Sequence, residues 1–394
     1  MTLNKGKVQG DWLSDPAAQK IFSLLLDAGY QAYAVGGCVR NALLDCPVND
    51  VDIATNARPE QVVALAKAAG VKSIPTGIDH GTVTLLKNST PFEVTTYRRD
   101  VETDGRRAVV AFADTIEEDA RRRDFTMNAL YASADGTLVD PLGGLQDCMD
   151  RRVVFIENAE ARVREDYLRI LRFFRFHAWY GDPGAGLDPD GLAACAELAQ
   201  GLDGLSRERV TSEILKLLAA PNPAPAVAAM DQAGILTRIL PGATAKPLAP
   251  LVHLEDGLEP SAIRRLAALG GDAISTFRLS RKEERAIKER RDALENMASL
   301  NSVAQLKGFD VARDVALMRA AIFDTLMGEN WINEIENAAR QTFPVSAANL
   351  PSELQGAAIG KALAQLKKAW VDSGFNLSKQ DLLRLLDENQ SDDG

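Results

Sequence analysis

The stretch Ala32–Arg40, AYAVGGCVR, decides the fold of the N-terminal part of this sequence. Its first four residues are apolar and strand-like, Gly36-Gly37 interrupts them, and the residues that follow have a helical pattern. Backbone amides at the start of such a helix attract phosphate, and glycines without side chains allow a close approach. Arg40 would lie in the first turn of the helix, where its guanidinium can bind a phosphate oxygen.

Asp50 and Asp52 follow about ten residues after the glycine turn, at the start of a second strand-like run, Val51–Ala54. On a strand, residues i and i+2 point to the same face. Two carboxylates on one face can hold a pair of divalent metal ions, an arrangement that serves phosphoryl or nucleotidyl transfer. Chance alone supplies about eight acid-x-acid triplets in a chain of this composition. The acid pair is therefore informative only together with the glycine turn and Arg40.

Further elements around this centre predict a mixed α/β domain from residue 30 to about 135. Helices are predicted over Asp15–Gly29, Cys38–Leu44 and Pro59–Ala69, and strands over Ala32–Val35, Val51–Ala54, Gly81–Leu86 and Phe92–Tyr97. The charged segment Arg98–Ala108 has no apolar face, and we expect it to be a mobile loop.

Beyond Ala120 we expect the chain to turn helical and to stay helical to its end. The sequence predicts a mixed-sheet head over residues 1–135 and two or three all-helical units after it, which we divide into a neck over 136–200 and a body and tail over 201–394. The fold class is accordingly α+β, with a mixed-sheet head followed by an all-α neck, body and tail.

Composition excludes several classes of protein. The chain has 394 residues, of which 46% are hydrophobic and 25% charged, which rules out wholesale disorder. Its formal net charge of −10 excludes a uniformly basic nucleic-acid coat, although a local basic surface is still allowed. Four cysteines without metal-ligand spacing, no signal peptide and no membrane-length apolar run predict a cytoplasmic protein with no membrane partner. No protein partner is implied.

The segment RRRDFTMNAL, residues 121–130, is a candidate nucleotide-binding element. Asp124 is placed as a helix N-cap, with Asn128 one turn further along. In one interpretation Arg123, Asp124 and Asn128 face the phosphates and ribose hydroxyls of a triphosphate. In the other, equally weighted, this is a capped helix with a solvated run of arginines.

The segment REDYLRILRFFRF, residues 164–176, is a candidate base-reading helix. Asp166, Arg169 and Arg172 have i, i+3, i+6 spacing, so we expect them along one stripe of a helix. A carboxylate beside a guanidinium matches the amine donor and ring acceptor of cytosine and adenine, and mispairs with uracil and guanine. The stripe would thus accept CTP and ATP, unless it is only an exposed salt-bridged face.

Together these motifs resemble the class II tRNA nucleotidyltransferase and bacterial poly(A) polymerase family. The resemblance is dense over residues 30–180. It runs in order through GGCVRN, NDVDIAT, HGTVTLL, FEVTTYRRD, RRDFTMNAL, VDPLGGLQD and REDYLRILRFFRF. It implies a nucleotidyltransferase head like that of polymerase β. Asn41 and Tyr167 depart from the family pattern, which usually has Asp and Pro there, and we expect these changes to tune the site without disabling it.

The resemblance also implies roles for individual residues. Catalytic, metal-binding carboxylates fall on Asp50 and Asp52, which would hold Mg²⁺, with Glu93 as a possible further acid. Combined with the residue patterns, the expected nucleotide contacts are Gly36, Gly37, Arg40, Arg123, Asp124, Asn128, Asp166, Arg169 and Arg172.

The expected function is CCA-adding tRNA nucleotidyl transfer, in which C, C and A from CTP and ATP are added to the tRNA 3′ end with release of pyrophosphate. Poly(A) polymerase, a partial CC-adding or A-adding enzyme, and a catalytically inactive RNA-binding protein stay open. Shortening the loop Arg98–Ala108 should impair A addition and spare C addition. The candidate RNA-binding cations are Lys282, Lys288, Arg290 and Arg291, and Lys361, Lys367 and Lys368 near the C-terminus.

Overall fold

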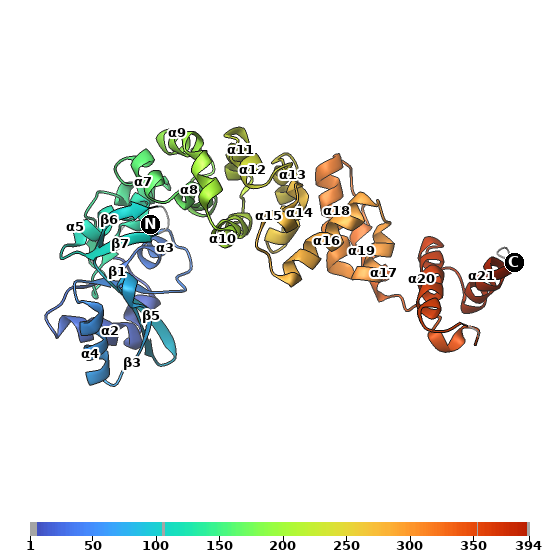
Figure 1. The fold of residues 1–394 in the computed structure, drawn as a ribbon, viewed down its shortest axis with the longest axis horizontal. Coiled ribbons are helices and arrows are strands. Elements are labelled where there is room, and N and C mark those ends of the chain that lie inside the picture. The colour runs from blue at the N-terminus through green and yellow to red at the C-terminus, as the bar shows by residue number, and fades with distance from the viewer. Residues whose placement is uncertain (1–5, 105–106, 353, 392–394) are drawn as a thin grey trace. The chain divides into compact units, whose positions relative to one another are not determined.

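The computed structural model describes residues 6–104, 107–352 and 354–391 of the chain. The chain divides into two compact units, Met1–Ile239 and Leu240–Gly394, and each is described by itself (Figure 1). The predicted three-part division into head, neck and body does not coincide with these units and stays a prediction.

Unit 1 is built on a mixed sheet of seven strands in the order β3-β4-β5-β2-β1-β8-β9. Strands β2 and β5 pair in parallel, and every other neighbouring pair is antiparallel. The strand bounds are β1 Ala32–Val35, β2 Asp52–Thr55, β3 Lys72–Gly77, β4 Thr82–Lys87, β5 Thr90–Thr96, β8 Tyr131–Ala132 and β9 Leu138–Val139. The mixed-sheet head predicted from the sequence is therefore confirmed.

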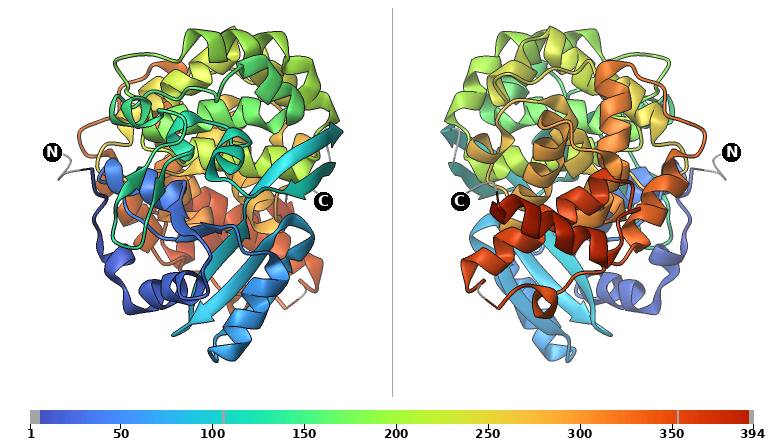
Figure 2. Two further views of the ribbon diagram at one scale, coloured as in Figure 1. Left: turned by 90° about the vertical axis from the view of Figure 1, so that its left-hand side faces the viewer. Right: turned by 90° about the vertical axis from the view of Figure 1, so that its right-hand side faces the viewer.

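Two amphipathic helices pack against this sheet, namely α2, Pro16–Leu26, and α4, Pro59–Ala68 (Figures 1 and 2). The Asp15 carboxylate caps α2 by accepting a hydrogen bond from the Ala17 amide at 2.8 Å, and Pro16 occupies the first turn. Buried Ile21, Phe22 and Leu25 on α2 recur at helical spacing and fill the core below the sheet. Between β1 and β2 the short helix α3, Gly37–Leu43, follows the glycine turn directly.

The expectation of a mobile loop over Arg98–Ala108 is wrong. Strands β6, Arg98–Asp104, and β7, Arg107–Phe112, pair antiparallel as a two-stranded sheet with an irregularity between Asp100 and Glu102. A ladder needs only backbone N–H and C=O groups, so charged side chains do not prevent it. The expected loop also ended at Ala108 and thus left out the strand-forming run up to Phe112. Residues 105–106 lie outside the described part of the chain.

The expectation that the chain stays helical after Ala120 is also wrong for the head. Helix α5, Ile116–Arg121, is followed by a single 3₁₀ turn, η2 Thr126–Asn128, and then by β8 and β9. The turn is held by Phe125, which is fully buried and packs against Phe155 and Phe176 with ring centroids 4.9 Å from each. Packing of Phe125 and pairing of β8 with β1 and β9 therefore override the helical periodicity.

From residue 145 to the end of unit 1 the chain is helical. The bounds are α6 Leu145–Met149, α7 Ala159–Glu165, α8 Leu168–Tyr180, α9 Pro189–Glu197, α10 Arg207–Leu218, α11 Ala224–Gln232 and α12 Ile235–Ile239, with the 3₁₀ helix η3 at Ala199–Gly204. Helix α8 is the centre of this group and contacts both α10 and α11 (Figure 1). Its Phe173 and Phe174 are fully buried, and Phe173 stacks on Phe155 with ring centroids 5.4 Å apart.

Unit 2 is made of helices. These are α13 Leu248–Leu254, α14 Ala262–Leu269, α15 Ala273–Thr276, α16 Arg281–Glu295, α17 Leu300–Lys307, α18 Phe309–Phe323, α19 Trp331–Arg340, η4 Ala347–Asn349, α20 Ala357–Asp372 and α21 Lys379–Ser391. A buried ion-pair network lies at its centre, in which Arg264 donates to Glu255 at 2.6 Å and to Asp314 at 2.9 Å. In the described part of the chain, no helix has the length and apolar character needed to cross a bilayer.

Candidate active site

Three carboxylates gather where β2 begins. Asp52 is the first residue of β2, and its direct neighbour on the parallel strand β5 is Glu93, so the two side chains lie on the same face of the sheet. Asp50 lies just before the strand and is exposed, whereas Asp52 is partly buried. The prediction that both aspartates belong to one strand is therefore wrong, because β2 begins only at Asp52, but their charges still interact.

Burial and mutual repulsion set these carboxylates apart from the paired acids around them. Burial, the Glu93 carboxylate and the Asp50 carboxylate raise the pKa of Asp52 to about 6, against the attraction of Arg123. Among the described residues, none of the three acids forms an ion pair with Lys or Arg. No group of three or more metal-ligating side chains is found in the described part of the chain. Any metal held here must therefore complete its coordination with phosphate oxygens or water, as Mg²⁺ commonly does.

The glycine turn brings Arg123 up to this cluster. Gly36 has φ +71°, and a Cβ atom there would lie 3.3 Å from Nη1 of Arg123. Arg123 is fixed from the other side, where it donates to the Asp119 carboxylate at 3.0 Å and to the Tyr131 hydroxyl at 3.2 Å. Burial opposes ionisation of Asp119, but Arg123 and Arg122 outweigh it and lower the pKa of Asp119 to about 2. Arg123 is consequently held rigidly next to the carboxylates.

A chain of hydrogen bonds connects four of the predicted nucleotide contacts. Arg40 donates to the Asn128 side-chain oxygen at 2.5 Å, and the Asn128 amide donates to Asp124 at 2.8 Å. Arg172 then donates to the other oxygen of Asp124, at 2.8 Å from Nε and 2.5 Å from Nη2. Residues from α3, from the η2 turn and from α8 thus meet in one buried network.

The network is charged and rigid. Burial opposes ionisation of Asp124, but Arg172 and the amide of Asn128 outweigh it and lower the pKa of Asp124 to about 2. The guanidinium of Arg40 stacks 3.8 Å from the ring centroid of Tyr180, and Asn41, one of the family departures, accepts from Arg40 at 2.7 Å. Asn41 thus positions Arg40, which agrees with a tuning role. Asp124 does not cap a longer helix as predicted, because only the η2 turn follows it.

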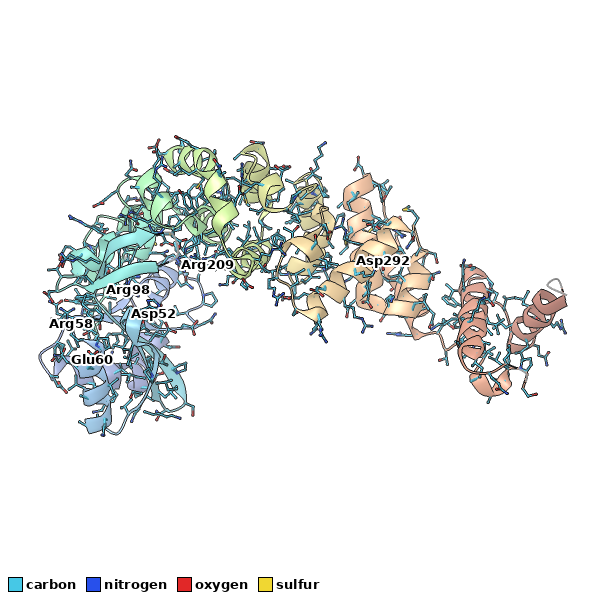
Figure 3. All side chains as sticks on the ribbon, in the orientation of Figure 1. Asp52, Arg58, Glu60, Arg98, Arg209 and Asp292 are labelled. Carbon is cyan, nitrogen blue, oxygen red and sulfur yellow. The ribbon has the colours of Figure 1, made fainter. Side chains whose placement is uncertain are left out.

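The predicted stripe of Asp166, Arg169 and Arg172 on one helix is only partly present. Asp166 has an extended backbone between α7 and α8, and its Oδ1 accepts from the Leu168 amide at 3.1 Å. Its ion-pair partner is Arg209 on α10, whose Nη2 lies 2.6 Å from Oδ2 (Figure 3 labels Arg209). Arg169 instead pairs with Glu165 at 2.5 Å. Asp166 and Arg169 therefore have separate partners.

Sequence reasoning missed three residues that hold the predicted ones in place. These are Asp119 behind Arg123, Glu165 behind Arg169, and Arg209 behind Asp166. Glu165 and Asp119 stand four residues before their partners, so helical i, i+4 pairing was a signal that could have found them. Arg209 lies 43 residues after Asp166 and had no such local signal.

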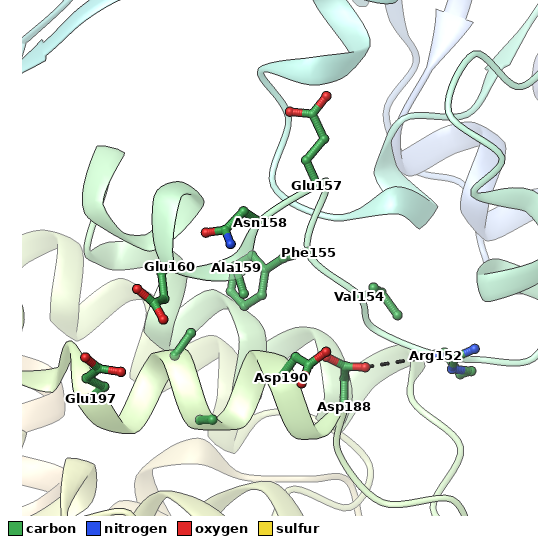
Figure 4. A pocket seen from close by; sticks show the side chains of 12 residues that line it. Arg152, Val154, Phe155, Glu157, Asn158, Ala159, Glu160, Asp188, Asp190 and Glu197 are labelled. Carbon is green, nitrogen blue, oxygen red and sulfur yellow. Dashed lines mark ion pairs between the residues drawn. The ribbon is translucent and has the colours of Figure 1, made fainter.

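A pocket of about 420 Å³ lies away from these residues and is a poor triphosphate site. Acidic side chains dominate its wall, and they belong to Glu157, Glu160, Asp188, Asp190 and Glu197 (Figure 4). Its one arginine, Arg152, lies 3.9 Å from Asp188. Phosphate would be repelled by this lining, so the carboxylate cluster and its neighbouring arginines are the better candidate.

The candidate RNA-binding cations of α16 are largely engaged with acids. Lys288 pairs with Asp292 at 2.9 Å, and Arg290 pairs with buried Asp314 at 2.7 Å. The Arg290 side chain is only 11% exposed, which removes it from the candidate RNA surface. An RNA surface on α16 or α20 stays a prediction.

Comparison with known proteins places the chain in a family. Residues 32–154 match the family "Poly A polymerase head domain", and residues 186–246 match "Probable RNA and SrmB- binding site of polymerase A". Human "CCA tRNA nucleotidyltransferase 1, mitochondrial" is 31% identical over 405 residues, which covers 94% of this chain and 92% of that protein. The "CCA-adding enzyme" of Geobacillus thermodenitrificans (strain NG80-2) is 42% identical over 221 residues, 55% of this chain and 52% of that protein.

A solved structure, the Bacillus stearothermophilus CCA-adding enzyme in complex with CTP, superposes with a TM-score of 0.72 at 28% identity. The superposition covers 96% of this chain and 98% of that one. Fold and site thus define a nucleotidyltransferase with a polymerase-type head. The chain belongs to the family of CCA tRNA nucleotidyltransferases and poly(A) polymerases.

Proposed function

We propose that this protein is a CCA-adding tRNA nucleotidyltransferase, which adds C, C and A from CTP and ATP to the 3′ end of tRNA and releases pyrophosphate. One observation carries the proposal. Carboxylates that form no Lys or Arg ion pair among the described residues lie near Arg123, which the buried Asp119 holds in place. This arrangement occurs in a chain that aligns over almost its whole length with a CCA tRNA nucleotidyltransferase.

The carboxylate cluster fits a divalent cation, for which we propose Mg²⁺ on Asp50 and Asp52. The fit rests on clustered carboxylate oxygens, which are the donors that Mg²⁺ prefers, and on the pKa of Asp52, which burial first and then repulsion by Glu93 and Asp50 raise to about 6. Bound there, the metal would activate the RNA 3′-hydroxyl and stabilise charge on the α-phosphate. Glu93, next to Asp52 across the strand pair, is a further candidate ligand.

The arginines supply the rest of the chemistry in this proposal. Arg123 is held close to Gly36 and Asp52, where its charge would compensate the triphosphate. Arg40 and Arg172 are joined through Asn128 and Asp124, which would orient the nucleotide without rearrangement on binding. Asp166 and Arg169 would read the base, the carboxylate accepting the exocyclic amine that cytosine and adenine share.

A cytoplasmic location is also proposed, on the reducing environment that four free cysteines favour. The human, mouse and zebrafish relatives carry the word mitochondrial in their names. Fractionation of cells that express the full-length protein would test this location, and enrichment in an organelle would contradict it.

The decisive experiment incubates the protein with Mg²⁺, each labelled NTP and a tRNA that lacks its CCA end. Addition of two C residues and one A, ending at three nucleotides, is the expected result. A long A tail would select poly(A) polymerase, and addition of only CC or only A would select a partial enzyme. Binding of tRNA without any incorporation would favour the inactive RNA-binding protein.

A further inference from the structure

The Asp166 carboxylate is held by two groups that are not its predicted partner. Oδ1 accepts from the Leu168 amide at 3.1 Å, and Oδ2 accepts from Nη2 of Arg209 at 2.6 Å. The Arg209 side chain is 40% exposed and that of Asp166 is 30% exposed, so the pair is open to an incoming molecule. Arg209 stands on α10, which packs against α8, so a packed helix anchors the backbone from which its side chain reaches Asp166.

Arg169 is held elsewhere. Its Nη1 donates to Glu165 at 2.5 Å and to the Arg162 carbonyl at 2.9 Å, and its Nη2 donates to the Arg122 carbonyl at 3.0 Å. Both terminal nitrogens of Arg169 are thus engaged, and Arg169 does not set the direction of the Asp166 carboxylate. Arg209 is the group that does.

We propose that Arg209 is a positioning residue for nucleotide selection, which aims the Asp166 carboxylate at the base. The inference rests on the proposed function, in which Asp166 reads the base. An ionised carboxylate only accepts hydrogen bonds, and each oxygen has capacity for a second one. With one donor on each oxygen, Asp166 presents its remaining lone pairs in a fixed direction to the amine of cytosine or adenine.

Removal of Arg209 would release the carboxylate to another partner. Arg172 lies within electrostatic reach of Asp166 and is one alternative partner for it. A carboxylate turned toward Arg172 would no longer meet the base edge in the orientation that rejects uracil and guanine. Because half-exposed ion pairs contribute little to stability, loss of Arg209 should leave the fold intact.

The test compares Arg209→Ala and Arg209→Lys with wild type in kcat and KM for all four NTPs, on tRNA that ends before CCA and on tRNA that ends in CC. For Arg209→Ala we expect discrimination against UTP and GTP to fall about tenfold. A tenfold change corresponds to the free energy of about one charge-assisted hydrogen bond. We expect kcat with CTP to change less than about twofold. Arg209→Lys keeps the charge and should restore most of the discrimination.

A matched control is Arg238→Ala, which removes a similar ion pair in the same unit. Arg238 donates to Asp203 at 2.7 Å, the two side chains are 37% and 58% exposed, and neither contacts the base-reading residues. This variant should discriminate among the four NTPs as wild type does. Circular dichroism of both alanine variants should match wild type, and a loss of helix in Arg209→Ala would contradict a purely positioning role.

Asp166→Ala and the double variant decide how Arg209 acts. If Arg209 acts through Asp166, its removal in the Asp166→Ala background changes discrimination no further. An equal loss in both backgrounds, or a rise in KM for tRNA alone, would overturn the inference and assign Arg209 to direct RNA binding. If Arg209→Ala leaves discrimination unchanged while Asp166→Ala relaxes it, only this inference fails. If Asp166→Ala itself has no effect, the proposed base reading fails as well.

Discussion

Replacing Asp52 with asparagine should abolish catalysis and, in the absence of metal, stabilise the head. The charge of Asp52 is opposed by burial and by its neighbours Glu93 and Asp50, and together these raise its pKa to about 6. Asparagine has the same shape and no charge, so it removes the repulsion without leaving a cavity. A residue that costs stability and serves only when a cation is bound is typical of a functional site.

The size of the effect follows from the pKa. The pKa of Asp52 is raised from 3.8 to about 6 on folding, and each unit corresponds to about 1.4 kcal/mol. Between pH 4 and 6 the folded state therefore binds more protons than the unfolded state, so wild-type stability falls as the pH rises through this window. Asp52→Asn should be more stable by about 3 kcal/mol above pH 7 and by only about 0.5 kcal/mol at pH 4.

Hydrogen exchange followed by mass spectrometry measures this in the full-length protein. Peptides from β2 and β5 report the opening of the head alone, so unfolding of unit 2 does not contribute. Wild type and Asp52→Asn are compared at the same pH, with chelator and then with Mg²⁺. Mg²⁺ should protect wild type, because a ligand that binds only the folded state stabilises that state. The difference in stability between wild type and Asp52→Asn should therefore disappear, and Mg²⁺ should not protect the variant.

Two results would refute the reasoning. One is a metal-free variant that is no more stable than wild type at pH 7.5, which would mean that neither burial nor the neighbouring carboxylates oppose the charge of Asp52. The other is equal protection of both proteins by Mg²⁺, which would place the cation elsewhere. Glu117→Gln is a suitable control, because it changes an exposed acid of α5 in the same unit.

Three other substitutions test the supporting structure. Asp124→Ala leaves Arg172 without its buried partner, so urea unfolding should show a loss of about 3 kcal/mol and the KM for CTP and ATP should rise; unchanged KM values would contradict the network. Gly36→Ala forces a side chain at φ +71° and places its Cβ 3.3 Å from Arg123, which should cost about 1 kcal/mol of stability. The KM for nucleotides should rise while the KM for tRNA stays the same, and equal rises in both would show a general defect. Arg264→Met breaks a buried pair of unit 2 and should lower protection of α14 amides by about 3 kcal/mol, whereas β2 amides should not change.

The strand-turn-helix unit around Gly36 was predictable because each of its signals is local. The apolar run, the two glycines and the helical spacing after them match β1 and α3 within a residue or two. The positions of Asp52 and Arg40 followed from these elements. Contact between Arg40 and Asn128 did not, since it depends on how the η2 turn packs 88 residues further along the chain.

The sequence could not predict which of several arginines forms the ion pair with a given carboxylate. The segment around Asp166 has several arginines at helical spacing, and any of them could neutralise it. The extended backbone at Asp166 ends α7 and turns the carboxylate toward α10, so that Arg209 becomes its partner. Periodicity treats residues 164–176 as one helix, and it cannot detect a single extended residue inside the pattern.

Pairing of buried acids with arginines also explains how an acidic protein can build a site for a polyanion. Two of the arginines that the proposal assigns to the nucleotide pair with a buried carboxylate, Arg123 with Asp119 and Arg172 with Asp124. These arginines are fixed before the ligand arrives, so little reorganisation is needed on binding, and their net positive field is small. In the proposed function, the charge that draws the triphosphate would therefore come largely from a cation on the Asp52 cluster, which lacks an ion-pair partner among the described residues. Nucleotide affinity should accordingly depend on metal more steeply than on any single arginine.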